Sequence, residues 1–160
     1  MVGSVINAGS DRLTGAGSKG IPQIIAPGCS DLIDFVGWQE IPPKYADRPF
    51  HEHNRLIKSS LLSPEERRTL IQDIATRLQD SKGPVHFILP SQGVEAWDKY
   101  GEPAYDPDGL SAMVDEVRHI IKPPLQLTEV DCHINDQAFA DTALNILDDW
   151  VAKGVVQCEL

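Results

Sequence analysis

Four short polar segments of this sequence carry the residue types that most often bind ligands or move protons. Each combines glycine, hydroxyl, carboxylate, amide or imidazole groups, and each directly follows an apolar run that we predict to be a buried strand. In parallel sheets, ligands bind beyond the carboxyl ends of the strands, so these segments are predicted to meet at one edge. The four segments are residues 7–12, 27–31, 90–93 and 131–136.

The first segment is suited to holding a phosphate group. Gly9 allows close approach of the backbone, Ser10 offers a hydroxyl group, and a helix predicted to follow would present free N–H groups. Arg12 could add a charge-assisted hydrogen bond, with Asp11 beside it. A helix capped by Ser10, with an exposed arginine, is an alternative of equal weight. The chain contains no GxxxxGK string followed by serine or threonine, so the P-loop fingerprint does not support a phosphate site.

Histidines in two polar regions could act as general acid or base, or donate hydrogen bonds to a ligand. His53 precedes Asn54 in an irregular stretch, and His133 and Asn135 lie in the last strand-end segment. These four residues are therefore candidate ligand-binding residues, and the two histidines are the candidate catalytic groups.

A bound metal ion is the weaker interpretation of the histidines. The triplets 51–53 and 131–133 both offer imidazole with carboxylate or thiol groups, which zinc accepts as ligands. We expect His51 and His53 to face opposite sides of an extended segment, which would keep them from sharing one ion. The sequence thus carries no strong metal signature, and magnesium is kept as a candidate cofactor beside ATP.

Further candidates follow the second and third predicted strands. Asp31 could cap a helix, bind a ribose hydroxyl or bind magnesium, while Gly28 and Gly93 would let a ligand approach the backbone. Cys29 could be a nucleophile activated by a helix N-terminus, but a small buried cysteine is the favoured interpretation. Residues 97–107, rich in aromatic and proline residues, are predicted to form a lid, a dimer contact or a packed surface loop.

Hydrophobic periodicity predicts the elements that would position these segments. Residues 63–78 begin with a serine N-cap, a proline at the first helical position and acidic residues in the first turn. Strands that alternate with helices favour a doubly wound, mostly parallel sheet with helices on both faces, as in Rossmann-like or flavodoxin-like folds. Residues 31–38 are predicted to be irregular or helical, and residues 39–62 to be a long loop. The predicted strands are residues 2–6, 21–26, 85–89 and 125–130, and the predicted helices are residues 11–19, 63–78, 107–121 and 136–150.

Length and composition restrict the class of protein. With 160 residues, of which 41% are hydrophobic and 24% charged, residues 1–160 are predicted to form one globular α/β domain. A formal net charge of −10 disfavours partners such as nucleic acid or an anionic membrane. No apolar run approaches the roughly 18 residues of a membrane span. Three widely spaced cysteines, Cys29, Cys132 and Cys158, favour reduced thiols and a cytoplasmic protein.

At these segments the chain resembles a family of uncharacterised proteins named for an ATP-binding domain like that of the tomato mosaic virus resistance protein. The resemblance covers nearly the whole chain. Its most specific stretch, DxHINDPxFA, is similar to residues 131–140, with Gln137 in place of proline. The other similar stretches are AGxDRL at residues 8–13, GIPQ at 20–23, GALDMVNF at 28–35, an HN pair at 53–54 and LPxxGVSxxD at 89–98.

The same resemblance has consequences for organisation and ligand. It implies two Rossmann-like halves, a dimer and a nucleotide bound by the full protein, with this chain as the C-terminal half and an N-terminal half as its partner. The apolar run that starts at Val2 agrees with that division. The chain departs from the family pattern at several positions, which weakens both a cysteine nucleophile and an anion contact at residue 92. These departures are Cys29, Ser30, Asp34, Gln92 and Glu95.

Three functions remain as hypotheses from the sequence. The first is a nucleotide-binding domain, with ATP as the cofactor and its phosphates at Gly9, Ser10 and Arg12. The second is an enzyme acting on a small phosphorylated or carboxylate substrate with a histidine as general acid or base. The third is a protein–protein interaction or dimerisation module. The residues expected to bind the ligand are Gly9, Ser10, Asp11, Arg12, Gly28, Asp31, His53, Asn54, Gly93, His133 and Asn135.

Overall fold

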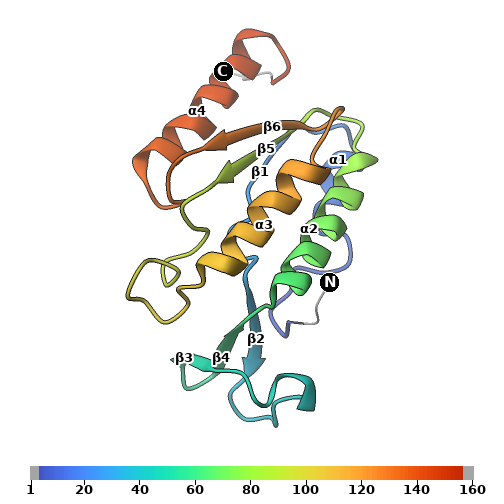
Figure 1. Ribbon diagram of the computed structural model, residues 1–160. Coiled ribbons are helices and arrows are strands. Elements are labelled where there is room, and N and C mark those ends of the chain that lie inside the picture. Colours follow the sequence, from blue (N-terminus) through green and yellow to red (C-terminus); the bar gives the residue numbers. More distant parts are fainter. Residues whose placement is uncertain (1–3, 157–160) are drawn as a thin grey trace.

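The computed structural model describes residues 4–156 and shows an α/β domain built around a three-stranded parallel sheet (Figure 1). The strand order is β1 (Gln23–Ile25), β5 (Val85–Pro90) and β6 (Gln126–Val130). Parallel neighbours and helical connections confirm the predicted α/β class and are compatible with a Rossmann-like layer.

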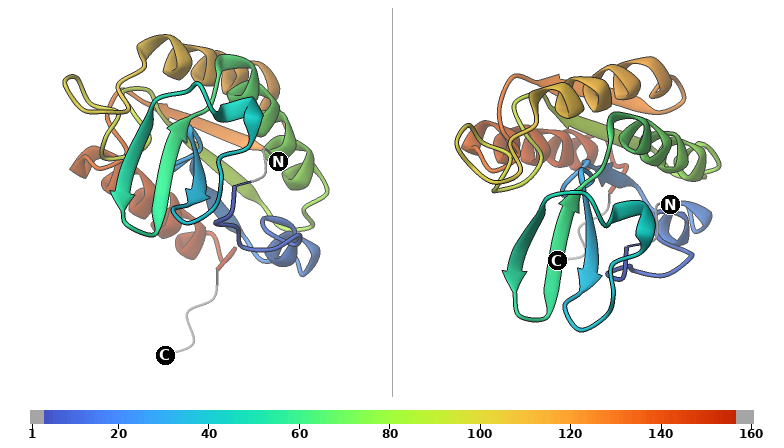
Figure 2. Two further views of the ribbon diagram at one scale, coloured as in Figure 1. Left: turned by 90° about the horizontal axis from the view of Figure 1, so that it is seen from below. Right: turned by 60° about the horizontal axis from the view of Figure 1, so that its bottom comes forward.

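Helices cover both faces of this sheet (Figure 2). The helices α2 (Pro64–Gln79) and α3 (Pro107–Ile120) pack side by side on one face, and α4 (Gln137–Ala152) lies against the other. Helix α2 begins as predicted, with a capping box between Ser63 and Glu66. The buried core between the sheet, α2 and α3 is formed by Ile71, Ala75, Leu78, Val85, Phe87, Leu89, Val94, Met113, Val114, Val117, Ile121 and Leu125.

A second, antiparallel sheet occupies the region predicted to be irregular. Its strand order is β2 (Leu32–Val36), β4 (Ile57–Leu61) and β3 (Phe50–Asn54), and a short 3-10 turn, η1 (Pro43–Tyr45), precedes β3. The prediction of an irregular piece followed by a long loop was therefore wrong. The strands were missed because polar residues interrupt them, and their pairing is supported by tertiary contacts rather than by propensity.

The N-terminal part also differs from the prediction. Of the expected strand at residues 2–6, positions 2 and 3 lie outside the described residues, and positions 4–6 are not in a strand. The expected helix at residues 11–19 is reduced to α1 (Thr14–Ser18). Its N-cap is Leu13 in the left-handed region rather than Ser10, because the preceding residues form a turn of their own. Gly20 ends the helix as expected, with φ at 75°.

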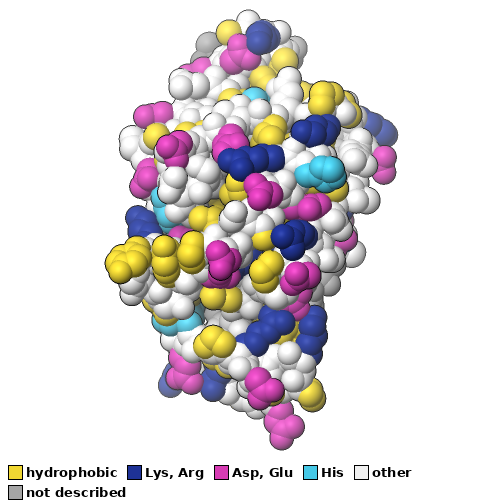
Figure 3. All heavy atoms as spheres, viewed as in Figure 1, with side chains coloured by type: hydrophobic (Ala, Val, Ile, Leu, Met, Phe, Trp, Pro, Cys, Tyr) yellow, Lys and Arg dark blue, Asp and Glu magenta, His cyan; other side chains and the backbone are white. Residues whose placement is uncertain are grey.

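The surface carries mixed charge. Figure 3 shows positive and negative side chains interspersed, with hydrophobic side chains gathered over the loop that precedes α3, where Tyr100 and Tyr105 are exposed. Within residues 4–156, no helix is both long and apolar enough to span a membrane.

Candidate functional site

A cavity of about 410 Å³ opens at the carboxyl ends of β5 and β6, next to the first turns of α2 and α3. We call it the strand-end cavity. Its position is the one where parallel sheets bind ligands, and its volume falls in the range of small-molecule sites. The residues that line it are Asp31, Arg67, Gln92, Asp98, Lys99, Tyr100, Ala104, Tyr105, Asp106, Pro107, Leu110, His133 and Asp136.

Asp31 is the most unusual group in this cavity. It is only 1% exposed, and its Oδ1 atom has no hydrogen-bond partner. Its backbone carbonyl accepts a hydrogen bond from the Leu62 amide, which fixes the start of β2 against the end of β4. Burial raises the pKa of the carboxyl from 3.8 to about 7, although the nearby Arg67 guanidinium opposes that rise. Buried polar groups without partners are rare and mark candidate ligand contacts.

Arg67, from the first turns of α2, is the cationic counterpart of Asp31. It is 2% exposed, its Nε atom donates to the Leu62 carbonyl, and its Nη2 atom lies 2.7 Å from Asp106 Oδ2. Asp106 also caps α3 by accepting from the Gly109 amide. A Cβ atom at Gly109 would come within 2.5 Å of Arg67 Cζ, so only glycine leaves room for the guanidinium.

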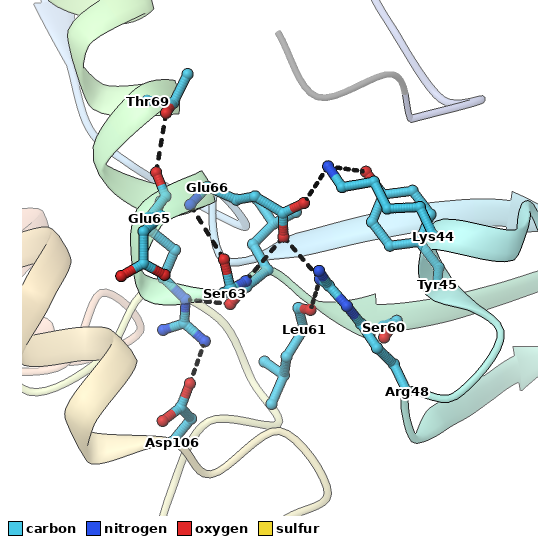
Figure 4. Close-up of polar contacts among 12 residues, drawn as sticks. Lys44, Tyr45, Arg48, Ser60, Leu61, Ser63, Glu65, Glu66, Thr69 and Asp106 are labelled. Atoms are coloured by element: carbon cyan, nitrogen blue, oxygen red, sulfur yellow. Dashed lines mark hydrogen bonds and ion pairs between the residues drawn. The ribbon is translucent and has the colours of Figure 1, made fainter.

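Figure 4 shows how the start of α2 is held in place. Glu66 accepts from the Ser63 amide and forms ion pairs with Lys44 and Arg48, which belong to the antiparallel-sheet region. Burial opposes ionisation of Glu66, but the hydrogen bonds from Arg48 and Lys44 prevail and lower its pKa from 4.5 to about 2. This cluster joins the second sheet to α2 and therefore fixes the helical turn that carries Arg67.

His133 is buried, but all its polar atoms already have partners. Its Nδ1 atom accepts from the Asn135 amide, so the hydrogen is on Nε2, which lies 2.8 Å from both Asp98 Oδ1 and the Glu95 carbonyl. Asp98 also accepts from the backbone amides of Val94 and Glu95. This bonding favours a structural role for His133, since no ring nitrogen remains free to exchange a proton with a ligand.

Gly93 explains why the His133–Asp98 pair can form. Its φ is 140°, and a Cβ atom there would lie 2.5 Å from both Asp98 Oδ1 and His133 Cδ2. The buried Glu95 lies beside this pair, with its pKa raised by burial and with Oε1 unpartnered. Asp31, Gly93 and His133, from three segments of the sequence, are thus brought together as predicted.

The first predicted phosphate site has a different geometry. The amides of Arg12, Thr14 and Gly15 already donate to the Gly9 and Asp11 carbonyls, so a row of free helical amides is not formed. Residues 15–20 have the spacing GxGxxG, but they form α1 and its final turn ahead of β1. The dinucleotide fingerprint instead lies between a strand and a following helix.

Arg12 nevertheless lines a second, smaller pocket of about 220 Å³ beside β1, which we call the Arg12 pocket. Arg77 joins it from α2 and donates to the Ser10 carbonyl at 2.8 Å, which holds the turn that carries Arg12. Gly28 lies in the wall of this pocket, and Gly9, Ser10 and Asp11 lie outside it. Its lining residues are Arg12, Leu13, Ile25, Ala26, Pro27, Gly28, Cys29, Ser30, Leu70, Asp73, Ile74 and Arg77.

His53 and Asn54 lie outside both cavities, on β3. Asn54 Oδ1 accepts from the amides of Leu56 and Ile57, so it shapes the hairpin turn. The expectation that His51 and His53 face opposite sides was wrong, because residues two apart in a strand share a face. Both rings contact Trp97, with centroid distances of 4.4 and 5.0 Å. Among the described residues, no three histidine, cysteine or carboxylate side chains are grouped to hold a metal.

Cys29 also differs from the favoured interpretation. It is exposed rather than buried, with φ at 52°, and its pKa is raised by partial burial and by the Asp31 carboxylate. A raised pKa makes the thiolate scarce, so the geometry does not support a nucleophile. Cys29 and Cys132 are free thiols, and Cys158 lies outside the described residues.

Sequence reasoning missed the charged residues that α2 contributes to both cavities. Arg67 and Arg77 occupy a helix that was analysed only for its apolar stripe. A signal was present, because Arg67 lies four residues before Ile71 and therefore shares the buried face of the helix. A buried charged residue needs a partner of opposite charge, which the partly buried Asp106 supplies.

Comparisons with known proteins agree with the family expected from the motifs. Residues 1–151 match the C-terminal domain of the uncharacterised protein family UPF0261. A UPF0261 protein of Brucella melitensis is 48% identical over 154 residues, which cover 96% of this chain and 37% of the relative. The ToMV resistance protein Tm-1 of Solanum lycopersicum is 29% identical over 147 residues, which cover 91% of this chain and 20% of that protein.

A third relative, a UPF0261 protein of Mesorhizobium japonicum, is 32% identical over 150 residues, which cover 92% of this chain and 38% of the relative. The chain thus spans little more than a third of the length of these bacterial relatives. Because the family match covers nearly all of the chain, the chain belongs to the uncharacterised protein family UPF0261, as a C-terminal domain.

Proposed function

We propose that this chain is a nucleotide-binding domain whose ligand, ATP or a related nucleotide, lies at the carboxyl end of β1. The observation that supports this most strongly is the Arg12 pocket, where two guanidinium groups stand beside an apolar wall. Guanidinium groups bind phosphate through paired, charge-assisted hydrogen bonds. The two arginines outnumber Asp73, the one carboxylate residue that lines this pocket, so the wall keeps an excess of positive charge in a chain with a net charge of −10.

The two parts of a nucleotide fit the two kinds of surface in this pocket. The phosphates would contact Arg12 and Arg77, while Leu13, Ile25 and Ile74 would contact the base or the sugar ring. A magnesium ion would be held mainly by phosphate oxygens and water, as is usual for this ion.

A thermal-shift titration tests this function directly. We expect ATP to raise Tm more than ADP, AMP and adenosine, in that order, because the arginines contact the phosphates. At a concentration of ATP about 100-fold above Kd, the stabilisation is about 2.7 kcal/mol, or roughly 5–10 °C for a domain of this size. Repeating each titration with and without magnesium separates the stabilisation by the metal ion from the stabilisation by the nucleotide.

Substitutions then locate the nucleotide. Arg12→Ala is expected to weaken ATP binding at least about tenfold, because it removes a charge-assisted contact. Arg68→Ala, on the exposed side of the same α2, is the matched control and should leave the affinity unchanged. If every nucleotide leaves Tm unchanged, or if Arg12→Ala binds ATP as tightly as the unsubstituted chain, the proposal is wrong.

A second function, as an interaction module, is supported by the outer face of α4. Leu144, Leu147 and Val151 are 55%, 39% and 39% exposed, and they recur at helical spacing on the side away from β6. Helices of globular proteins normally bury such a stripe. We propose that this face contacts a second copy of the chain in a homodimer, and that an N-terminal half-domain is a further partner in the longer relatives.

Light scattering after gel filtration tests the dimer. The unsubstituted chain should have the mass of two copies, and a Leu144→Asp variant the mass of one. Thr142→Asp is the control for the charge itself, because it adds the same charge on the side of α4 that faces the sheet. A monomeric mass for the unsubstituted chain at high concentration would contradict the homodimer.

A further inference from the structure

The strand-end cavity contains a buried acceptor without a partner beside a largely buried guanidinium group. Asp31 Oδ1 has no partner, and the hydrogen bonds of Arg67 run from Nε to the Leu62 carbonyl and from Nη2 to Asp106. Both side chains are almost fully buried, at 1% and 2% exposure, and both line the cavity. An unsatisfied buried polar group costs about 1–3 kcal/mol, so a ligand that donates a hydrogen bond to Asp31 would relieve this cost.

An anionic ligand is disfavoured by the rest of the cavity wall. Asp98, Asp106 and Asp136 line it together with Asp31, so an added negative charge would face four carboxyl groups. The charge of Arg67 is already paired with Asp106 at 2.7 Å. Phosphates therefore fit the Arg12 pocket better than they fit this cavity.

A cationic ligand is disfavoured for a different reason. An ammonium group that reached Asp31 would also approach the Arg67 guanidinium, and Lys99 adds a further positive charge to the wall. A metal ion would need several ligands at short range. No group of three such side chains is present in the part of the chain that the structure describes.

A neutral hydroxyl group satisfies both partners at once. It donates to a carboxylate and accepts from a guanidinium, and it brings no charge into the acidic surroundings. Adjacent hydroxyl groups would make such contacts repeatedly. At the cavity, the rings of Tyr100 and Tyr105 lie 5.4 Å apart in an edge-to-face arrangement and remain 88% and 46% exposed. They offer an apolar surface for the C–H face of a sugar ring.

We propose that the strand-end cavity binds a neutral polyhydroxylated molecule of monosaccharide size, with Asp31 and Arg67 as the groups that bond to its hydroxyls. This site is distinct from the proposed nucleotide site. The segment 28–31 separates them, with Gly28, Cys29 and Ser30 facing the Arg12 pocket and Asp31 facing the strand-end cavity.

The first test is saturation-transfer NMR on the unsubstituted chain with a panel of aldoses, ketoses, inositols and linear sugar alcohols. At least one polyol should give a signal that saturates with concentration and is not displaced by ATP. Because the chain itself is the sample, this measurement does not depend on the folding of any variant. The absence of a saturable signal across the whole panel would overturn the proposal.

The second test places the ligand. Asp31→Asn should weaken polyol binding about tenfold, since a charged acceptor becomes a neutral one. Asp108→Asn, which removes one carboxylate from the exposed first turn of α3, is the matched control and should leave the affinity unchanged. Equal affinity of the Asp31 variant and the unsubstituted chain would overturn the site. ATP binding without polyol binding refutes only this inference, whereas polyol binding without ATP binding refutes only the nucleotide proposal.

Discussion

Replacing Asp31 by asparagine should stabilise the folded protein, and the gain should grow with pH. The substitution preserves the shape of the side chain and removes its ability to ionise. It breaks no hydrogen bond of Oδ1, because that atom has none. It also relieves repulsion from Glu95 and Asp98, both of which raise the pKa of Asp31.

The magnitude follows from the difference in pKa between the folded and unfolded states. An Asp31 carboxyl with a pKa of about 7 in the folded chain and 3.8 when unfolded is harder to ionise in the folded state. Its contribution to stability is fully present below pH 3.8 and is lost as the pH rises toward 7. Above that pH the total loss is about 4 kcal/mol. For a domain of this size, 4 kcal/mol corresponds to roughly 10 °C in Tm.

Urea denaturation at a series of pH values measures this effect. The difference in unfolding free energy between Asp31→Asn and the unsubstituted chain should be small at pH 4 and should approach about 4 kcal/mol at pH 8. The Asp108→Asn variant is the control for the loss of a carboxylate at an exposed position. A constant difference across the series, or a variant that is less stable at pH 8, would show that the Asp31 carboxylate is well satisfied when ionised.

Two other substitutions test how the cavity is held together. Glu66→Gln should destabilise the chain by about 2 kcal/mol at pH 7, a value reduced because solvent screens the partly exposed Lys44 and Arg48. The pKa of Glu66 is lowered to about 2, so its contribution is present above pH 4.5 and is lost as the pH falls toward 2. Urea denaturation of the unsubstituted chain and the variant should therefore converge at low pH, and a gap that persists at pH 2 would contradict the ion-pair explanation. Gly93→Ala should destabilise the chain by more than about 2 kcal/mol, because the new Cβ atom clashes with Asp98 and His133. Urea denaturation at pH 7 measures this loss of stability. An unchanged unfolding free energy would show that Asp98 and His133 can move apart to make room for the Cβ atom.

The sequence predicted the elements whose signals are local. Helix α2 carries a capping box at its start and an apolar stripe along its length, and β5 is apolar except for His86, so both were predicted within a few residues. The antiparallel sheet was not predicted, because its strands include Asp34, His51 and Glu52, which are poor strand formers. Asp34 is accommodated in β2 by Ser59 of the neighbouring strand, which donates to it at 2.6 Å. Such a pairing joins residues 25 positions apart, and no local pattern encodes it.

Some of the residues expected at the site do lie together in the structure. The rule that ligands bind at the carboxyl ends of parallel strands placed Asp31 and His133 at one cavity, with Gly93 packed against His133. It could not identify which of these groups keeps an unused hydrogen-bonding atom. That property depends on neighbours such as Arg67, which comes from a turn of α2 outside the four strand-end segments.

The contrast between His133 and Asp31 shows why residue type alone is a weak guide to a site. Histidine is the more versatile proton donor and acceptor, and the sequence analysis therefore named His53 and His133 as candidate catalytic groups. In the folded chain both of its nitrogens are bonded, so moving its proton would first break contacts with Asp98, Glu95 or Asn135. Asp31 has an ordinary side chain, but it is buried with Oδ1 unpartnered, and its ionisation opposes folding. A buried group that lowers stability and keeps one oxygen without a partner gains most from a ligand, so Asp31 is the residue from which binding and proton transfer at this cavity should first be sought.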